Sequence, residues 1–524
     1  MPSLQSVLMP GCWQALAWLA IGGLLWWLVD RFLDKFVRRL PPGPVPLPII
    51  GNLLNLIGEP PHKALPALSS KYGPLMTLYF GSKRTVILGS GEMLKEAFVT
   101  NGSSTAGRPR MPSAGLVSNG YRNIAFSEGT LWRNLRKMAK LELLNHGKIP
   151  DALSIVYSEV STVMGVLHRL CKGGGGETNV APKKYLRSIT MNTIFRLMIG
   201  KRLDVEDPNK TPDMLELDVI YSVLFQMLGS GAPEDIFPLL SLLPTPRMRR
   251  IRKLVARRNT LLTAIIDKKK SDLASCLPGC EAQDVMTSLL KSQPMSKLSE
   301  ADCAMMVNDI VAAAIDTTAS SMEWLLLFLA THQETQAAVH RELDRAFGAS
   351  LPAGVQIDTN KLPMLRASIM EAMRMRMVAP LGVPHESRVA ITLGGYGIPA
   401  NTQLITNAMH VANDPKTWRD PERFRPERFL EEESHLRLQG GGSFPAVEDY
   451  KFAPFSVGHR YCPGSDMAKM ELFLIAAHLL HSFHWAPTQG GKICLEGQFG
   501  LTLEAPDQVL LCTPRHPRAP AAGT

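Results

Sequence analysis

Cysteine is scarce in this chain: the eight cysteines among 524 residues are irregularly spaced. Such usage is typical of a reducing compartment and excludes a small domain held together by disulfides. Cys276 and Cys280 flank Leu-Pro-Gly, but no matching pair of Cys or His follows them, as a structural zinc site would require. We therefore expect neither a disulfide nor a zinc ion at these two positions.

The chain also lacks the motifs of nucleotide and nucleic-acid binding. Its two glycine runs, 173–176 and 440–442, have neither the strand-to-helix context nor the Lys-Ser/Thr of a phosphate loop, and there are no internal repeats. Lys plus Arg exceed Asp plus Glu by 57 to 47, a net charge of +10, but the basic residues are spread along the chain. This excess predicts acidic partners, such as anionic lipid headgroups or an acidic protein, and no nucleic acid.

The N-terminal region contains one long uncharged run, Gly11 to Val29. As a helix these nineteen residues would extend about 28 Å, close to the roughly 30 Å of bilayer hydrocarbon. A cleaved signal peptide is the alternative, but it has a basic start and a shorter apolar region. We predict that residues 1–30 are a retained membrane anchor. Four basic residues follow the run and none precedes it, so the body should stay on the cytoplasmic side: Arg31, Lys35, Arg38 and Arg39.

A proline-rich segment, Pro41 to Pro48, follows the basic residues and favours a stiff, extended chain. We assign residues 31–50 to a basic and proline-rich hinge, 51–515 to the main domain and 516–524 to a flexible tail. Helical patterns dominate the main domain, and β-rich stretches lie near its two ends. The expected fold class is mainly α with small β-sheets (α+β). The β-rich stretches are Leu75–Phe80, Thr85–Leu88, Val389–Ile405 and Leu501–Leu511.

The segment F-S-V-G-H-R-Y-C-P-G, Phe455 to Gly464, places Cys462 among turn-forming residues just before an apolar helical pattern. We expect Gly458 and Gly464 to adopt backbone angles that other residues avoid. With Pro463 in the first helical turn, Cys462 falls at the helix cap, where the helix dipole and free amides favour a thiolate. A single thiolate cannot hold zinc alone, but it can be the one axial ligand of haem iron. A buried structural cysteine is the alternative.

The pattern F-x-x-G-x-R-x-C-x-G resembles the haem-binding loop of the cytochrome P-450 superfamily. The proline-rich hinge and the P-E-R-F segment at Pro426–Phe429 resemble its large plant microsomal branch. The resemblance implies the cytochrome P-450 fold after one transmembrane helix, and haem b (iron protoporphyrin IX) with an axial thiolate. Cys462 would be the metal ligand, and four residues of its loop would contact the cofactor: Phe455, Gly458, Arg460 and Gly464.

A long apolar helical pattern, Ala301 to Leu329, contains the sequence A-A-A-I-D-T-T. Polar residues in such a helix need partners or line a cavity. Ala313 and Thr317 share one helix face, because they are four residues apart. The segment resembles the oxygen-activation motif of the same superfamily, which implies that Ala313 leaves room beside the haem and that Thr317 and Asp316 deliver protons. Ala314 stands where that motif usually has glycine.

Other contacts are also implied by the resemblance. Glu371 and Arg374 would join Arg428 in a buried triad that fixes the core. Trp132 and Arg136, four apart in W-R-N-L-R, would bind the haem propionates. His385 is a further cofactor-binding candidate, with a satisfied loop histidine as the alternative. Five basic residues would dock an acidic reductase: Lys137, Lys140, Lys451, His459 and Lys469.

These features predict a monooxygenase that inserts one atom of O2 into a small lipophilic or aromatic metabolite of specialised metabolism. Its electrons would come from NADPH through cytochrome P-450 reductase, at the endoplasmic reticulum membrane with the catalytic domain in the cytosol. The triplets beginning at Asn101 and Asn209 should then carry no sugar. The basic run Arg247–Arg258, after the apolar 239–243, either is a solvated face or rests on the membrane. Two other functions stay open: a haem-thiolate isomerase or dehydratase, and a non-enzymatic membrane haem sensor or carrier.

Overall fold

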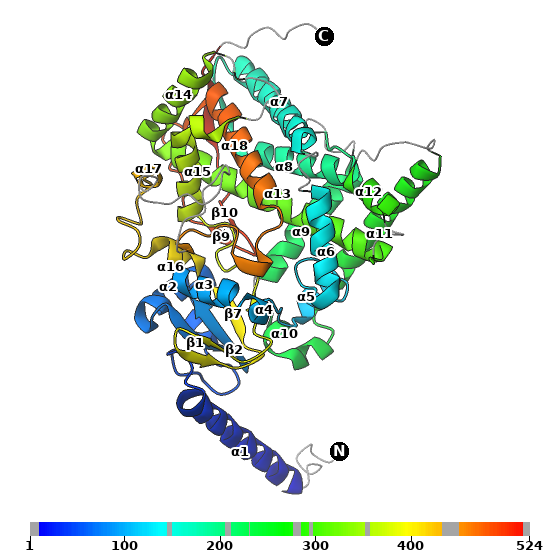
Figure 1. Ribbon diagram of the computed structural model, residues 1–524, viewed down its shortest axis with the longest axis vertical. Coiled ribbons are helices and arrows are strands. Elements are labelled where there is room, and N and C mark those ends of the chain that lie inside the picture. The colour runs from blue at the N-terminus through cyan, green and yellow to red at the C-terminus, as the bar shows by residue number, and fades with distance from the viewer. Residues whose placement is uncertain are drawn as a thin grey trace, which may run out of the picture. The chain divides into compact units, whose positions relative to one another are not determined.

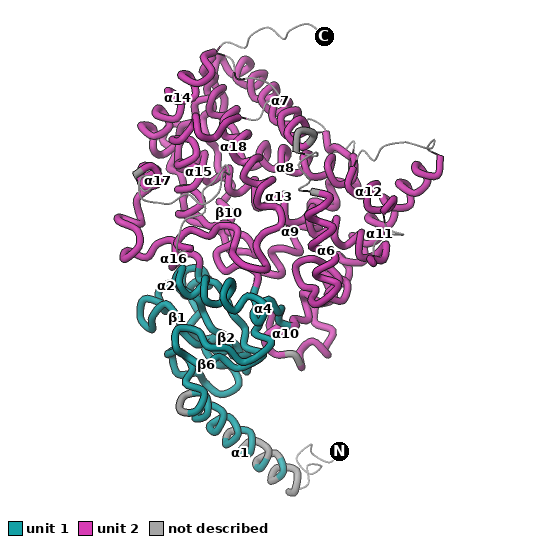
Figure 2. The backbone as a smooth tube through the Cα atoms, in the orientation of Figure 1, with its two compact units in different colours: residues 1–109, 384–407 teal, residues 110–383, 408–524 magenta. Residues whose placement is uncertain are grey.

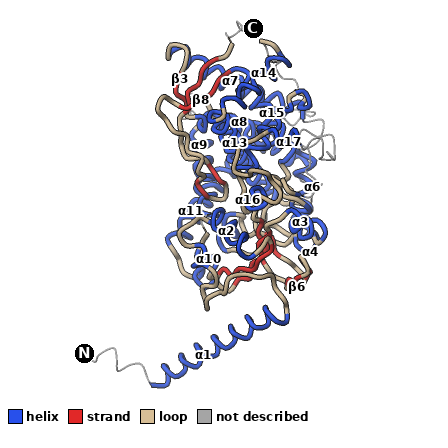
Figure 3. The backbone as a smooth tube through the Cα atoms, turned by 90° about the vertical axis from the view of Figure 1, so that its left-hand side faces the viewer, coloured by secondary structure: helices blue, strands red, loops and turns tan. Residues whose placement is uncertain are grey.

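The computed structural model describes residues 10–143, 149–204, 211–229, 231–275, 284–292, 297–349, 351, 357–431 and 450–516. Cys276, Cys280, Asn209, the second glycine run and the tail beyond 516 lie outside these ranges. The chain forms two compact units, residues 1–109 with 384–407, and residues 110–383 with 408–524 (Figure 2). Helices dominate and the strands are short (Figure 3), so the predicted mainly α class with small sheets is confirmed.

The first unit is built on a four-stranded sheet in the order β1-β2-β7-β4. β1 (Leu75–Phe80) and β2 (Lys83–Leu88) form an antiparallel hairpin, and β2 pairs in parallel with β7 (Gln403–Thr406). The β-branched run Thr85-Val86-Ile87 is fully buried, which explains why this segment forms a strand. The unit also contains β4 (His385–Glu386), the hairpin of β5 (Ile391–Leu393) and β6 (Tyr396–Ile398), α2 (Pro61–Tyr72), α3 (Gly91–Lys95) and α4 (Gly102–Thr105).

The apolar N-terminal run belongs to helix α1 (Pro10–Phe32), which continues into a π-helical turn, Leu33–Val37 (Figure 1). Several of its large apolar side chains are exposed, among them Trp18, Leu25 and Trp26. Just after the helix, the buried Asp34 carboxylate accepts hydrogen bonds from Tyr79 of β1 and Arg84 of β2. These bonds attach the end of α1 to the sheet of the same unit.

The second unit is mainly helical. Its helices are α5 (Pro112–Val117), α6 (Gly129–Leu143), α7 (Ile149–Gly173), α8 (Pro182–Ile199), α9 (Pro212–Gly229), α10 (Pro233–Ile236), α11 (Pro246–Ala274), α12 (Val285–Ser292), α13 (Glu300–Thr331), α14 (Gln333–Phe347), α15 (Pro363–Met375), α16 (Ala408–Asn413), α17 (Glu427–Glu431) and α18 (Ser465–Ser482). A small sheet has the order β3-β11-β8, formed by Thr178–Val180, Leu510–Pro514 and Phe483–Pro487. The hairpin of β9 (Gln498–Phe499) and β10 (Leu503–Glu504) completes the unit.

Helix α13 forms the centre of the second unit and agrees with the predicted helix 301–329. Its N-terminus has a capping box, in which Ser299 and Asp302 satisfy each other's backbone N–H groups. It is long and apolar enough to cross a bilayer, but 78% of its most apolar stretch is buried in the protein. It is therefore a core helix, which packs against α6, α8, α15 and α18 (Figure 1).

The expected triad lies beside this core. Glu371 accepts hydrogen bonds from Arg374 at 2.8 and 2.9 Å and from Arg428 at 3.0 Å, and all three side chains are buried. The backbone N–H of Arg425 donates to the same carboxylate at 2.9 Å. The arginines also donate to backbone carbonyls, for example Arg374 to Ala412 at 2.6 Å. The triad thus fixes α15 to α16 and to the segment that enters α17.

Candidate active site

The loop that carries Cys462 is held by its own backbone. Ser456 and Gly458 have positive φ angles of 62° and 73°, and the Cys462 N–H donates to the Phe455 carbonyl at 3.0 Å. Our prediction for Gly464 is wrong, because its φ of −90° is ordinary. A Cβ atom at Gly464 would meet nothing within 4 Å, so neither strain nor packing requires glycine here. The position beside Cys462 is instead open, which leaves room for a bound group.

The helix after the loop begins later than predicted. Gly464 is the N-cap of α18 and Ser465 its first residue, so Pro463 lies outside the first turn and Cys462 two residues before the cap. Burial raises the pKa of the Cys462 thiol, although the Gly464 N–H and Arg136 act in the opposite direction. The polypeptide alone therefore favours the neutral thiol, contrary to our expectation. A coordinated metal ion would ionise it, since coordinated thiols lose their proton outright.

Two arginines join helix α6 to the cysteine loop: Arg136 of the helix and Arg460 of the loop. The Arg136 guanidinium donates to the carbonyl of Tyr461, next to Cys462. Arg460 lies 4.2 Å above the Trp132 ring and donates to the carbonyls of Ile124 and Ser127 at 3.2 and 2.7 Å. The Trp132 Nε1 is buried and finds no hydrogen-bond partner among the described residues. A buried indole N–H without an acceptor fits a carboxylate of a bound group, as the haem propionates would supply.

Helix α13 opens toward a space at Ala313. Ala313 is exposed and Thr317 half-buried, although most of this helix is buried. The Thr317 hydroxyl donates to the Ala313 carbonyl at 2.8 Å, which confirms that the two residues share a face. Because α13 packs against both α6 and α18, this face belongs to the same helix cluster as Trp132 and the cysteine loop.

Asp316 has a partner that sequence reasoning missed. Its buried carboxylate forms an ion pair with Arg187 of α8, which also binds Asp218 and Ser222 of α9. Arg187 lies 129 residues earlier in the chain, and an arginine on an amphipathic helix gives no signal of such a partner. The charge next to Thr317 is thus part of a network that links α13, α8 and α9.

A second missed carboxyl group lies on α18. Glu471 is buried against α13, where it hydrogen-bonds the Thr318 hydroxyl, and burial raises its pKa to about 8. Glu471 is therefore mostly protonated at neutral pH, next to the turn that carries Thr317. A glutamate inside the apolar pattern 467–483 was the signal available in the sequence.

His385, the remaining cofactor candidate, belongs to the other compact unit. It is buried on β4, its Nδ1 lies 2.9 Å from the Thr105 carbonyl, and its ring stacks on Phe98 with centroids 4.1 Å apart. These contacts are those of a satisfied core histidine, the alternative stated above. Its role toward a cofactor stays a prediction.

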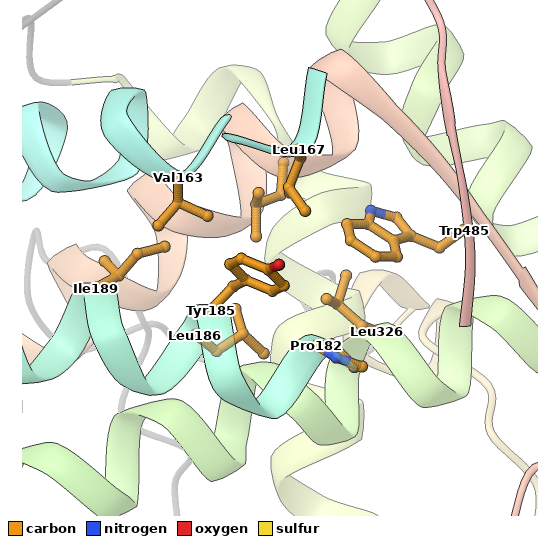
Figure 4. A pocket seen from close by; sticks show the side chains of 9 residues that line it. Val163, Leu167, Pro182, Tyr185, Leu186, Ile189, Leu326 and Trp485 are labelled. Atoms are coloured by element: carbon orange, nitrogen blue, oxygen red, sulfur yellow. The ribbon is translucent and has the colours of Figure 1, made fainter. Parts of the chain in front are cut away.

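A small cavity in the second unit does not serve as a substrate site. Its volume is about 10 Å³, and apolar side chains such as Val163, Leu167 and Leu326 point into it (Figure 4). A cavity of this size holds one water molecule at most, which is far too small for a metabolite, although Tyr185 and Trp485 are also part of its lining. It is a packing gap between α7, α8 and α13.

Comparison with known proteins agrees with this geometry. The cytochrome P-450 family model matches residues 41–511. Curated relatives include a flavonoid 3'-monooxygenase of Petunia hybrida, 28% identical with 94% of this chain and 97% of the relative covered. A trans-cinnamate 4-monooxygenase of Glycyrrhiza echinata is 30% identical, with 86% and 88% covered. A solved structure of a zebra fish cytochrome P-450 with progesterone has a TM-score of 0.74 at 28% identity, and covers 87% of this chain and 100% of its own.

Proposed function

The chain belongs to the cytochrome P-450 family and is a haem-thiolate monooxygenase, and from this premise we propose that it hydroxylates a small lipophilic or aromatic metabolite at a membrane. The observation that carries the proposal is the open cradle around Cys462. There a half-buried cysteine, an unpartnered Trp132 N–H and the open positions at Gly464 and Ala313 belong to one unit, in packed helices and the loop that leads into one of them.

The residues of the cradle fit haem b. Cys462 would hold the iron, and Phe455, Gly458 and Gly464 would shape the loop under the porphyrin. Trp132, Arg136 and Arg460 supply N–H donors for two propionates, since indole and guanidinium groups form strong bonds to carboxylates. When bound, the haem supplies reductive activation of O2 at a thiolate-ligated iron.

Proton delivery is the task we assign to α13. The Thr317 hydroxyl can exchange its bond to the Ala313 carbonyl for a bond toward the open space, and so pass a proton. Asp316, held by Arg187, would assist as part of the network that reaches α9. Glu471, kept protonated by burial, is a further proton source one helix away.

We propose that α1 anchors the protein in the endoplasmic reticulum membrane as a single span, with the body in the cytosol. The uncharged run, the exposed apolar side chains of α1 and the basic residues that follow support this orientation. The exposed Leu239, Leu242 and Leu243 support a second membrane contact before the basic helix α11. Sugar at Asn101 would contradict the orientation; its side-chain amide already donates to the Glu96 carbonyl at 3.0 Å.

The redox partner would be an acidic NADPH–cytochrome P-450 reductase. Lys137, Lys140, Lys451 and His459 are exposed in the second unit. Lys469 is half-buried and lies 3.7 Å from Asp466. Such a set of basic groups steers and orients an acidic protein.

An aromatic substrate is supported by the names of the relatives, which act on flavonoid and cinnamate compounds. The test is product formation by microsomes that carry this chain, supplied with a library of lipophilic and aromatic metabolites. We expect turnover to require NADPH, reductase and O2 together, and Thr317→Ala to consume NADPH with little product. Turnover without NADPH would favour an isomerase or dehydratase, and haem binding with no turnover would favour a sensor.

A further inference from the structure

A group of potential metal ligands lies far from the cysteine loop, where α14, α18 and the segment after β11 meet. One oxygen of Asp344 and one ring nitrogen each of His481 and His516 all lie within 4.8 Å of one another. His481 is buried, whereas the side chains of Asp344 and His516 are 41% and 29% exposed. The group is therefore nearly assembled, and two of its three side chains are partly exposed.

Two of these atoms face each other without a hydrogen bond. Among the described residues Asp344 Oδ1 and His516 Nε2 have no hydrogen-bond partner, and at 3.4 Å they form an ion pair when His516 is protonated. This separation exceeds the usual N–H···O range. It matches the edge of a tetrahedral site, since ligand atoms about 2.0 to 2.1 Å from zinc are about 3.3 to 3.4 Å from each other.

The other atoms of these side chains are held in place. The His481 Nε2 lies 2.9 Å from the Gly348 carbonyl, and a proton on that nitrogen leaves a lone pair on the other. Histidines that bind metals commonly donate their second N–H to a carbonyl in this way. Arg515 donates to Asp344 Oδ2 at 2.7 Å and to the His481 carbonyl at 2.9 Å, so it orients the carboxylate with Oδ1 toward His516.

The donor set selects the class of metal. Two imidazoles and one carboxylate oxygen suit Zn²⁺, whereas Ca²⁺ and Mg²⁺ need more oxygen ligands. The positive charge of Arg515 weakens the binding of every dication, so only a metal with a high affinity for imidazole can be held here. We propose that Asp344, His481 and His516 bind a Zn²⁺ ion, with water at the fourth position.

This site is separate from the haem. Cys462 lies just before α18 and His481 near its end, and a helix of 18 residues extends about 27 Å. The ion would fasten the C-terminal segment to α14 and α18. The presence or absence of zinc is therefore independent of whether the protein is an active monooxygenase.

The test uses the full-length, haem-loaded protein without a histidine tag, dialysed against buffered Zn²⁺ and analysed for metal per haem. We expect one zinc per haem in the wild type, with only nitrogen and oxygen neighbours in zinc X-ray absorption. His516→Gln and Asp344→Asn should each weaken zinc binding at least about tenfold, because each removes a ligand.

His484→Gln is the matched control. His484 bonds to Gln333 at 2.7 Å and lies outside the cluster, so its replacement should leave zinc binding unchanged. Retention of the haem spectrum shows that each variant is folded. No zinc in the wild type, sulfur neighbours in the absorption spectrum, or equal binding by all three variants would overturn the proposal.

Discussion

Replacement of Glu371 by glutamine should destabilise the helical unit far more than its small change in shape suggests. The wild-type carboxylate lies between two buried guanidinium groups, with N···O distances of 2.8 to 3.0 Å. Glutamine removes the only negative charge of the triad and places an amide N–H₂ against an arginine. Removing one partner of a buried ion pair costs about 3 to 5 kcal/mol.

The expected shift in midpoint follows from the size of the unit. An unfolding entropy of about 2.1 cal/mol/K per residue over about 390 residues gives about 0.8 kcal/mol/K. Glu371→Gln should therefore lower the thermal midpoint by about 4 to 6 °C, measured by loss of the haem–carbon monoxide band on heating.

Glu216→Gln is the matched control, since Glu216 pairs with Arg257 on the surface, where both side chains are exposed. Exposed pairs contribute little, so this midpoint should not move measurably. Equal midpoints for the two variants would show that the triad does not fix the core.

Three further predictions concern the site. Trp132→Phe removes the unpartnered indole N–H, so haem transfer to an acceptor protein should become about tenfold faster or more, and an unchanged rate would contradict its contact with a propionate. Arg187→Ala should lower the amount of product formed per NADPH consumed, and Arg187→Lys should partly restore it. The same ratio of product to NADPH in Arg187→Ala and the wild type would show that the Asp316 network has no part in proton delivery. The pKa of Glu471 is about 8 in the folded protein and about 4.5 in the unfolded chain, so between these pH values the folded state binds more protons than the unfolded state. The free energy of unfolding should therefore fall as the pH rises from about 4.5 through 8. Glu471→Gln should flatten this part of the stability profile, measured by urea unfolding at several pH values; a wild-type slope in the variant would contradict it.

Local patterns predicted the helices and strands well. The apolar periodicity predicted the extent of α13, and short apolar runs, β-branched in β2, predicted β1 and β2. Such patterns are visible in the sequence because the residues of one element are consecutive. The backbone of Gly464 and the start of α18 were predicted wrongly. The motif indicated a special backbone conformation at Gly464, whereas the structure has an ordinary φ and open space there. It also indicated a helix that begins at Pro463, whereas α18 begins at Ser465.

Contacts between distant segments could not be predicted in the same way. Arg187 and Glu471 lie on helices whose patterns give no distance to α13, so the ion pair with Asp316 and the bond to Thr318 appear only in three dimensions. The same holds for Asp344, His481 and His516, which come from three separate segments. The triad was an exception, because its sequence motifs resemble those of a known family.

Monooxygenation by this protein requires the bond between Cys462 and haem iron. The measurement is the absorption spectrum of the reduced, purified protein with carbon monoxide, for the wild type and for Cys462→Ser. The wild type should show the red-shifted band of a thiolate-ligated haem, and the variant should lose it. A wild type without this band, or a variant that keeps it, would show that Cys462 does not bind the iron.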